Sequence, residues 1–317
     1  DARRVCEKLG IPHYVTNLVD NFGHDVLDDF VQEYARGRTP IPCVRCNTFT
    51  KFRDLLVKAD AIDATWLATG HYARMGRVGE HAVMLRGLDA GKDQSYFLWG
   101  IERPVLERLV LPIGTQTKAE TREIARRFGL RTAEKIESQD ICFVPDGDHV
   151  RVIAEHLGAD APALQPGPLR LVNGDVIGEH QGFARYTIGQ RKGLPGGFAE
   201  PMFVVEIVPG DRAVVIGPRD ALLGRGVEAR EINWLADAPP VGASIQVQVR
   251  NRARPSAATV VRLDGDAIEL ALDDAIQAIS PGQSLVMYDG DVVLGGGVIE
   301  RGMVGAPRSR MLPLMAG

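Results

Sequence analysis

Hydrophobic and polar residues alternate with two different periods along the chain, and the change falls near residue 148. Before that point, apolar residues recur at intervals of three and four, which is the spacing of amphipathic helices. Beyond about residue 165, short alternating runs separated by turn residues predict mainly β structure. The pattern therefore divides the chain into an α/β region followed by a β-rich region.

The first region is expected to alternate helices with strands of a parallel sheet. Thr117 and Glu120 have the spacing of a capping box, which should begin a helix that ends at Gly129. Another helix should follow Asn47 or Thr48, either of which is suited to be its N-cap. The remaining helices are predicted over residues 1–9 and 22–36, and the strands over residues 11–19 and 65–69.

The second region carries three strong hairpin signals, at Asn173-Gly174, Asp264-Gly265 and Asp289-Gly290. Strands over residues 244–249, 258–263 and 267–272 are consistent with a small barrel. We therefore expect four parts in the chain. These are an α/β catalytic domain at 1–147, a small central domain at 148–209, a C-terminal β-barrel at 210–302 and a flexible tail at 303–317.

The composition suits a soluble protein. The chain has 317 residues, of which 45% are hydrophobic and 25% charged, and it holds four cysteines. No apolar run has transmembrane length and no signal peptide is visible, so we expect a cytoplasmic protein without membrane contact. In a reducing compartment, a cysteine pair more often means catalysis or metal binding than a disulfide. The net charge of −4 does not indicate nucleic acid, so RNA contact would depend on local basic patches.

The first candidate site is the cysteine pair Cys43 and Cys46. Pro40 and Pro42 predict a stiff, non-helical turn here, just ahead of a helix. Cys46 would then lie at the positive end of that helix, close to Lys51, and both features favour a thiolate. The spacing alone leaves half a zinc site, a redox pair and two ordinary thiols open.

Two further parts of the sequence bear on the site, Gly70 with His71 and Cys142. The predicted strand at 65–69 runs into Gly70 and His71, and ligands bind at the carboxyl ends of strands in such folds. His71 is therefore a candidate site residue. Cys142 lies between Ile141 and Phe143, and such neighbours are typical of a core residue.

Six segments of the chain are distinctive when taken together. They are TPIPCVRCN, ATGHYAR, LRGLDAGKDQSYFL, SQDICFV, GEHQGFARYTIGQRKGL and SPGQSLVMYDGDVVLGGGVIE. Together they resemble the tRNA-specific 2-thiouridylase family, whose members replace O2 of the wobble uridine with sulfur in tRNAs for lysine, glutamate and glutamine. The resemblance runs in order from Asp1 to about Glu300.

This resemblance implies an N-terminal α/β ATP-pyrophosphatase domain of the adenine nucleotide alpha hydrolase type, a small central β-rich domain and a C-terminal β-barrel that binds tRNA. It also implies that ATP, with Mg²⁺, adenylates the uridine C2 oxygen. A sulfur-relay protein or cysteine desulfurase then delivers sulfur as a persulfide on Cys142. Cys46 is the nucleophile that helps to release the sulfur, and it can form a disulfide with Cys142. Cys142 is expected to be a catalytic residue instead of a core residue only because of this resemblance.

The resemblance also implies binding residues. Gly70 matches the family's adenine-nucleotide contact, and the arginines Arg252 and Arg254 would contact phosphate together with Arg250. The positions that match tRNA contacts are Ile41, Pro42, Cys43, His71, Lys92, Asp93, Gln94, Arg250, Asn251 and Gln283.

The chain departs from the family pattern in three places. The SGGxDSS loop that cradles pyrophosphate is absent, so we expect an incomplete α/β domain that lacks its first strand and this loop and is inactive as given. A non-catalytic tRNA-binding remnant is the alternative function. Ile41 stands where many members have asparagine, and Cys43 where many have aspartate. Cys43, Cys46 and Cys142 could instead bind a four-iron four-sulfur cluster, or the cysteines could hold a structural metal.

Overall fold

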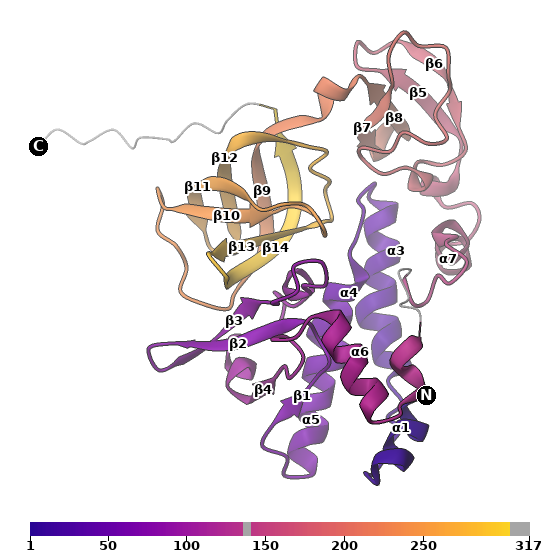
Figure 1. The fold of residues 1–317 in the computed structure, drawn as a ribbon. Coiled ribbons are helices and arrows are strands. Elements are labelled where there is room, and N and C mark those ends of the chain that lie inside the picture. Colours follow the sequence, from indigo (N-terminus) through magenta and orange to yellow (C-terminus); the bar gives the residue numbers. More distant parts are fainter. Residues whose placement is uncertain (136–140, 305–317) are drawn as a thin grey trace, which may run out of the picture. The chain divides into compact units, whose positions relative to one another are not determined.

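The computed structural model describes residues 1–135 and 141–304, and these form two compact units (Figure 1). The first unit comprises residues 1–28, 42–147 and 291–293. The second comprises residues 29–41, 148–290 and those from 294 onward. The predicted tail beyond residue 304 and the first part of the SQDICFV segment lie outside the described residues.

Helices of the first unit begin and end largely where local signals predict. Thr117 and Glu120 form the capping box of α6, and Gly10 and Gly129, with φ of +67° and +60°, follow the ends of α1 and α6. The helix predicted over 22–36 is confirmed, although its middle is a π-helix. The helical segments up to residue 127 are α1 (Ala2–Leu9), α2 (Val19–Phe22), η1 (Gly23–Leu27), α3 (Asp28–Ala35), α4 (Pro42–Arg45), η2 (Cys46–Arg53), α5 (Asp54–Ala61) and α6 (Lys118–Arg127), of which α3 belongs to the second unit.

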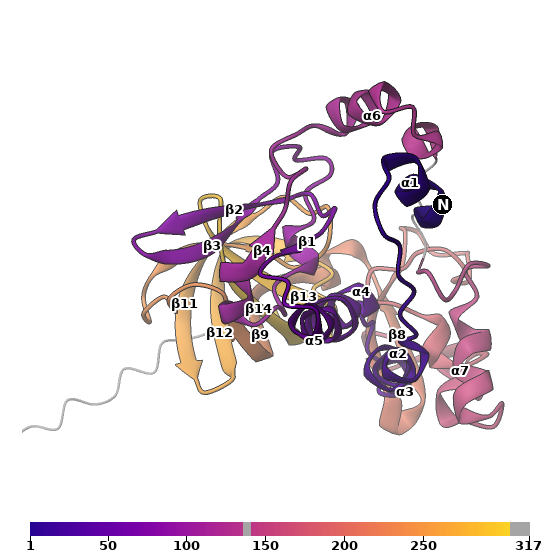
Figure 2. The same ribbon diagram turned by 90° about the horizontal axis from the view of Figure 1, so that it is seen from below.

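The α/β prediction is confirmed by a parallel strand pair. The strand β1 (Leu67–Ala68), expected at 65–69, pairs in parallel with β4 (Leu109–Val110). Beside them, β2 (Ala73–Val78) and β3 (His81–Arg86) form a long antiparallel ribbon, which Figure 2 shows from a second direction.

The strand predicted over residues 11–19 is wrong. These residues have no regular secondary structure up to the start of α2, and the side chains of Tyr14 and Val15 are 82% and 76% exposed. Alternation describes only a preference for extended backbone, and a strand also needs a neighbour that accepts and donates its hydrogen bonds.

The second unit contains a four-stranded sheet after helix α7 (His149–Leu157), in the order β6-β5-β8-β7. The predicted turn at Asn173-Gly174 joins its first two strands as a hairpin. The strands are β5 (Gly167–Leu171), β6 (Val176–His180), β7 (Phe203–Val208) and β8 (Ala213–Gly217).

A closed six-stranded barrel completes the second unit and confirms the barrel prediction. Its order is β13-β10-β11-β12-β9-β14, and β13 pairs with β14 to close it. Alternate strand residues such as Val247, Leu270 and Leu285 are fully buried inside, as expected for a barrel core. The strands are β9 (Leu223–Trp234), β10 (Ser244–Gln248), β11 (Ser256–Asp264), β12 (Ala267–Gln277), β13 (Ser284–Asp289) and β14 (Val292–Met303).

Short 3₁₀ turns connect these elements. They are η3 (Ser95–Phe97), η4 (Arg103–Arg108), η5 (Arg131–Glu134), η6 (Pro162–Leu164), η7 (Phe183–Arg185), η8 (Pro209–Asp211) and η9 (Arg219–Leu222). Within the described part of the chain, no helix combines the length and the apolar character needed to cross a membrane.

Candidate functional site

Both cysteines of the predicted loop lie in a helix. The helical run starts at Pro42 with α4, so Cys43 is in its first turn, and Cys46 begins the π-helix η2. The predicted non-helical turn is therefore wrong. Proline fits the first position of a helix, because its fixed φ is helical and its missing N–H needs no partner there.

Neither predicted N-cap caps this helix. Asn47 is buried inside the run, and its Nδ2 donates to the carbonyl oxygen of Phe97 at 2.9 Å. The hydroxyl of Thr48 donates to the carbonyl oxygen of Val44 at 2.9 Å. These side chains fix the helix against its own unit, and Cys46 lies inside the run instead of at its positive end.

The π-helix brings Lys51 close to the thiols. A π-helical turn pairs residues five apart, which is the separation between Cys46 and Lys51. The charge of Lys51 lowers the pKa of Cys43 and Cys46. The same charge lowers the pKa of His71, so one ammonium group influences three candidate residues.

The thiols of Cys43 and Cys46 are nevertheless harder to ionise than ordinary cysteines. Burial is the largest cause and raises both pKa values, and the neighbouring charge of Cys142 raises them further. Lys51 opposes these effects without outweighing them. The predicted stabilised thiolate at Cys46 is therefore wrong for this state of the molecule, because burial costs the charged form more than the nearby ammonium group restores.

Cys142 is the third cysteine that the resemblance assigns to the site. Its side chain is exposed, and its charge contributes to raising the pKa of both Cys43 and Cys46. Among the described residues, no group of three His, Cys, Asp or Glu side chains is arranged to hold a metal ion. The iron–sulfur cluster and the structural metal therefore stay predictions from the sequence.

Gly70 and His71 follow β1 at its carboxyl end. A Cβ atom on Gly70 would meet only Ile113, at 3.9 Å, so the exposed backbone leaves room for a flat ligand. His71 Nδ1 shares a hydrogen bond of 2.9 Å with the hydroxyl of Thr69, and its ring stacks on Phe52 with centroids 5.9 Å apart. Burial, aided by Lys51, lowers the pKa of His71 to about 4, so the imidazole is neutral at neutral pH.

The turn of Lys92, Asp93 and Gln94 is held by its own side chains. Asp93 Oδ1 accepts from the backbone of Gly87 and Ser95 at 2.8 Å and 3.0 Å. Gln94 Oε1 accepts from the backbone N–H of the residue after His71, at 2.9 Å. The Asp93 carboxylate thus shapes the turn, and Gln94 ties it to the segment that carries His71.

The second unit contains an open pocket with a volume of about 600 Å³, and it brings together three of the residues matched to tRNA contacts, Arg250, Asn251 and Gln283. Arg250 and Asn251 lie in the loop after β10, and Gln283 directly precedes β13. The other lining residues are Thr39, Thr187, Ile188, Gly189, Phe203, Arg219, Leu222, Gln277, Ala278 and Ser280.

Arg219 and Arg250 give the pocket a positive charge, and no carboxylate is among the described residues of its lining. Arg250 Nη2 donates to the carbonyl oxygen of Ala278 at 2.7 Å, and Arg219 Nε donates to Gln277 Oε1 at 3.2 Å. Each guanidinium group has five N–H donors, so donors remain for a ligand. Hydroxyl and amide groups around the arginines suit a polar anionic ligand such as a phosphodiester.

Several pocket residues were not found by sequence reasoning. Thr187 lies inside the dense polar segment at 178–194, and that density was its only signal. Thr39 begins the TPIPCVRCN segment but was not matched to a tRNA contact, and Arg219 carried no signal, since it is far from Arg250 in sequence. Arg252 and Arg254, predicted to share phosphate contacts with Arg250, are exposed in the loop after β10 but do not line the pocket.

Three family models match this chain in succession. They describe a tRNA methyl transferase HUP domain at residues 1–146, a tRNA methyl transferase PRC-barrel domain at 151–218 and an aminomethyltransferase β-barrel domain at 224–299.

Curated proteins called tRNA-specific 2-thiouridylase MnmA are similar over nearly the whole chain. The protein from Carboxydothermus hydrogenoformans is 44% identical over 305 residues, which cover 95% of this chain and 82% of that protein. The protein from Geobacter metallireducens is 45% identical over 304 residues, covering 96% and 82%. The one from Zymomonas mobilis is 45% identical over 301 residues, covering 95% and 79%.

Proposed function

Because this chain belongs to the tRNA-specific 2-thiouridylase family, we propose that it transfers sulfur to C2 of the wobble uridine in tRNAs for lysine, glutamate and glutamine. The observation that carries the proposal is that the charges of Lys51 and Cys142 both act on the Cys46 thiol. The descriptions of two family models refer to methyl transfer. Adjacent thiols beside a lysine favour sulfur transfer, because thiolates carry sulfur as persulfides.

The roles proposed for Cys142 and Cys46 follow from the solvent exposure of Cys142. Cys142 is exposed and so can receive sulfur from a relay protein or a cysteine desulfurase as a persulfide. Its terminal sulfur forms a bond to uridine C2, and the bond from C2 to its activated oxygen breaks. The Cys46 thiolate then attacks Cys142 Sγ and breaks the sulfur–sulfur bond. The products are 2-thiouridine and a Cys46–Cys142 disulfide, which an external thiol must reduce before the next cycle.

Deprotonation of Cys46 is the step that this chain controls most directly. Burial raises its pKa, so few thiolates exist in the resting protein. Lys51 is the nearby group that lowers this pKa and would stabilise the thiolate as it forms. Protection of Cys46 from premature oxidation and its readiness to react thus both depend on Cys46 and Lys51.

ATP, with Mg²⁺, is the proposed second substrate, and it makes the uridine oxygen a leaving group. The open face of Gly70 supports this role, because a flat adenine can approach a backbone that lacks Cβ. The SGGxDSS loop of the family does not occur among these 317 residues. Under this proposal residues 1–147 perform activation and sulfur transfer, residues 148–209 form the central domain and residues 210–302 contribute RNA contacts.

The positively charged pocket is the proposed RNA contact in the second unit. Arg250, Asn251 and Gln283 line it together with Arg219, and neighbouring phosphates need such charges for affinity. In the first unit, the proposed contacts near the target base are Pro42 and Cys43, which follow Ile41, and the neutral His71. An imidazole that stays neutral can offer hydrogen bonds and stacking there but not charge.

The test measures 2-thiouridine in tRNA incubated with ATP, a cysteine desulfurase, cysteine and this chain fused behind the SGGxDSS segment of a relative, since the 317 residues by themselves are expected to be inactive. We expect Cys46→Ala and Cys142→Ala to abolish product while tRNA affinity and melting temperature stay close to those of the wild type. Mass spectrometry of the Cys142 peptide gives a second reading that needs no ATP. It should find one added sulfur atom in the wild type and in Cys46→Ala.

A non-catalytic tRNA-binding protein is the second candidate function, and the pocket with its two arginines favours it. It predicts tRNA binding in the wild type without persulfide on Cys142 and without thiouridine. Arg250→Met should weaken tRNA binding and reduce its salt dependence under either function, so only the sulfur readings separate the two.

A further inference from the structure

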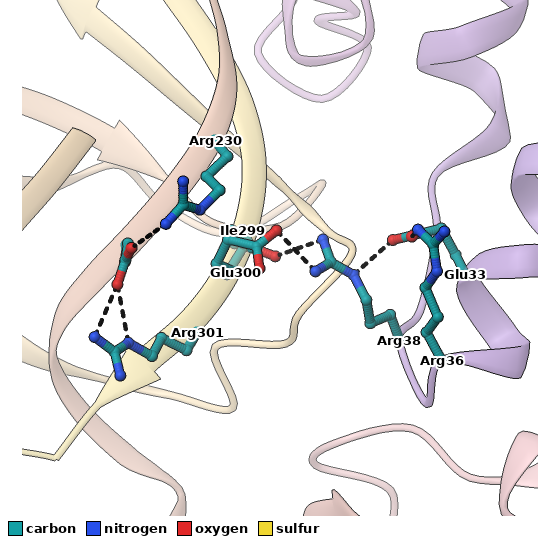
Figure 3. A network of polar contacts seen from close by, with 8 residues as sticks. Glu33, Arg36, Arg38, Arg230, Ile299, Glu300 and Arg301 are labelled. Carbon is teal, nitrogen blue, oxygen red and sulfur yellow. Dashed lines mark hydrogen bonds and ion pairs between the residues drawn. The ribbon is translucent and has the colours of Figure 1, made fainter. Parts of the chain in front are cut away.

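The segment before the cysteine helix is fixed within the second unit by residues that are far away in sequence. Figure 3 shows Arg38 between Glu33, on α3, and Glu300, on β14. Arg38 Nε donates to Glu33 Oε2 at 2.7 Å and its Nη1 donates to Glu300 Oε1 at 2.8 Å. A third donor, Nη2, reaches the carbonyl oxygen of Ile299 at 3.3 Å. One guanidinium group thus joins α3 to the barrel.

This contact is shielded from water most fully on its Glu33 side. The Arg38 side chain is 17% exposed and the Glu33 side chain 11%, whereas the Glu300 side chain is 33% exposed. Burial by itself would lower the pKa of Arg38, but Glu300 and Glu33 outweigh it and raise the pKa. Shielded charge-assisted hydrogen bonds of this length are strong and have a defined direction.

The next residue is held through its backbone. Thr39 N–H donates to the carbonyl oxygen of Pro281 at 2.9 Å, and Gln283 Nε2 donates to the carbonyl oxygen of Thr39 at 2.7 Å. Gly282 lies against it, and a Cβ there would come within 2.9 Å of the Thr39 nitrogen. Both backbone groups of Thr39 are therefore bound by the turn between β12 and β13.

The held segment leads directly into the catalytic helix. Ile41 ends this stretch of the second unit, and Pro42 is the first residue of α4, which carries Cys43. The two stretches are joined by a single peptide bond with a proline ring, which allows little rotation. A displacement of Arg38 and Thr39 would therefore be passed to the start of the cysteine helix.

We propose that Arg38 is a positioning residue for the sulfur-transfer reaction: by bridging Glu33 and Glu300 it fixes the point at which the cysteine helix begins. This inference rests on the proposed function only for the roles of the cysteines. The same barrel strands and turns carry Gln283, so Arg38 connects the chain segment ahead of Cys43 to a wall of the RNA-binding pocket.

Arg36 supplies a matched control two residues away. Its side chain is 68% exposed and meets Glu33 at 3.4 Å, without a contact to the barrel strands. Arg36→Met removes the same charge from the same carboxylate, Glu33, but leaves the bridge to Glu300 intact. Arg38→Lys keeps the charge of Arg38, but an ammonium group cannot serve both carboxylates and the Ile299 carbonyl in a fixed fork.

The first test is amide hydrogen exchange, which needs neither tRNA nor sulfur. In Arg38→Met, the amides of residues 43–47 should exchange about tenfold or more faster than in the wild type, while those of α6 in the same unit change little. Arg38→Lys and Glu300→Gln should show a smaller increase in the same place, and Arg36→Met none. Unchanged exchange at 43–47, or an equal increase in α6, would overturn the proposal.

Kinetics provide the second test. Arg38→Met and Glu300→Gln should lower kcat for thiouridine formation, by about tenfold or more in the first, with KM for tRNA within about threefold of the wild type. A raised KM with unchanged kcat would assign Arg38 to RNA binding and overturn the proposal. Absence of thiouridine from the wild type would reject the proposed function, whereas the exchange measurement would still decide the role of Arg38.

Discussion

Two stretches that are adjacent in sequence are held in opposite ways. Residues 37–39 have no regular secondary structure, yet their charges and backbone groups are bound by distant parts of the second unit. Residues 42–53 are helical, so their backbone hydrogen bonds are mostly internal. Their reactive thiols depend on burial and on one lysine for their state.

This difference shows that regular structure and fixed position are separate properties. An irregular segment is well placed when partners far apart in sequence bind it from several directions. A helix supplies its own hydrogen bonds and can therefore carry a reactive group whose surroundings change during a reaction. The following changes are ordered from the largest expected effect to the smallest.

Gly282 lies against the backbone of Thr39 in the irregular stretch. Gly282→Ala should lower the free energy of unfolding by about 3 kcal/mol, because a Cβ would collide with the Thr39 backbone and the φ of +87° is unfavourable for alanine. Gly242 is a matched control, with a φ of +88° and nothing within 4 Å of the added Cβ. Gly242→Ala should cost about 1 kcal/mol.

Denaturant unfolding of both variants gives the comparison. Equal losses for Gly242 and Gly282 would mean that the Thr39 segment yields easily, and the contrast between the two stretches would disappear. A larger loss at Gly282 would show that the irregular stretch is rigidly enclosed.

Beside the cysteine helix, His71 should make stability depend on pH. Its pKa in the folded protein is lowered to about 4, whereas an imidazole in an unfolded chain binds its proton near pH 6.5. Between these values the unfolded state binds more protons, so stability is present above pH 6.5 and is lost as the pH falls toward 4. The loss should be about 3 kcal/mol.

Urea unfolding of the wild type and His71→Gln at several pH values tests this point. The difference between the two proteins should be nearly constant above pH 6.5 and should shrink at lower pH. A constant difference down to pH 4 would contradict the buried, neutral imidazole. His180 also has a pKa lowered by burial, so only the difference between the proteins isolates His71.

Lys51 should have the smallest effect, on the reactivity of the thiols. Lys51→Met should raise the pKa of Cys46 further, because it removes the charge that opposes burial. At a fixed pH below that pKa, alkylation of Cys46 should slow about two- to threefold, and the rate profile should move to higher pH. The pKa of His71 should rise in the same variant.

Peptide mass spectrometry after timed alkylation measures the rates. Lys58→Met, in the exposed part of α5, is the control and should leave the profile unchanged. A profile for Lys51→Met that does not move, or that moves to lower pH, would remove Lys51 from the thiol site.

The elements that sequence analysis predicted correctly share a local origin. The capping box at Thr117 and Glu120 needs only four residues, and the Asn-Gly and Asp-Gly turns need two. The barrel strands followed from their alternation, since one side of each strand must face the core. The residues matched to the family were also partly gathered, with Arg250, Asn251 and Gln283 around one pocket.

The failures have a common cause as well. The extended pattern at 11–19 found no partner strand among the described residues, and Pro42 began a helix instead of breaking one. The thiolate predicted at Cys46 is disfavoured because burial raises the pKa of Cys46, and this burial was not visible from its neighbours in sequence. In each case a contact between distant residues, or its absence, decided the outcome.

The sequence by itself determined the order of an α/β region and a barrel, and most turns and helix ends. These depend on backbone preferences within a few residues. Only the tertiary structure decided that the thiols of Cys43 and Cys46 resist ionisation, and that Arg38 joins Glu33 to Glu300. Desolvation and ion pairing depend on which distant atoms exclude water from a group, and that is known only once the chain has folded.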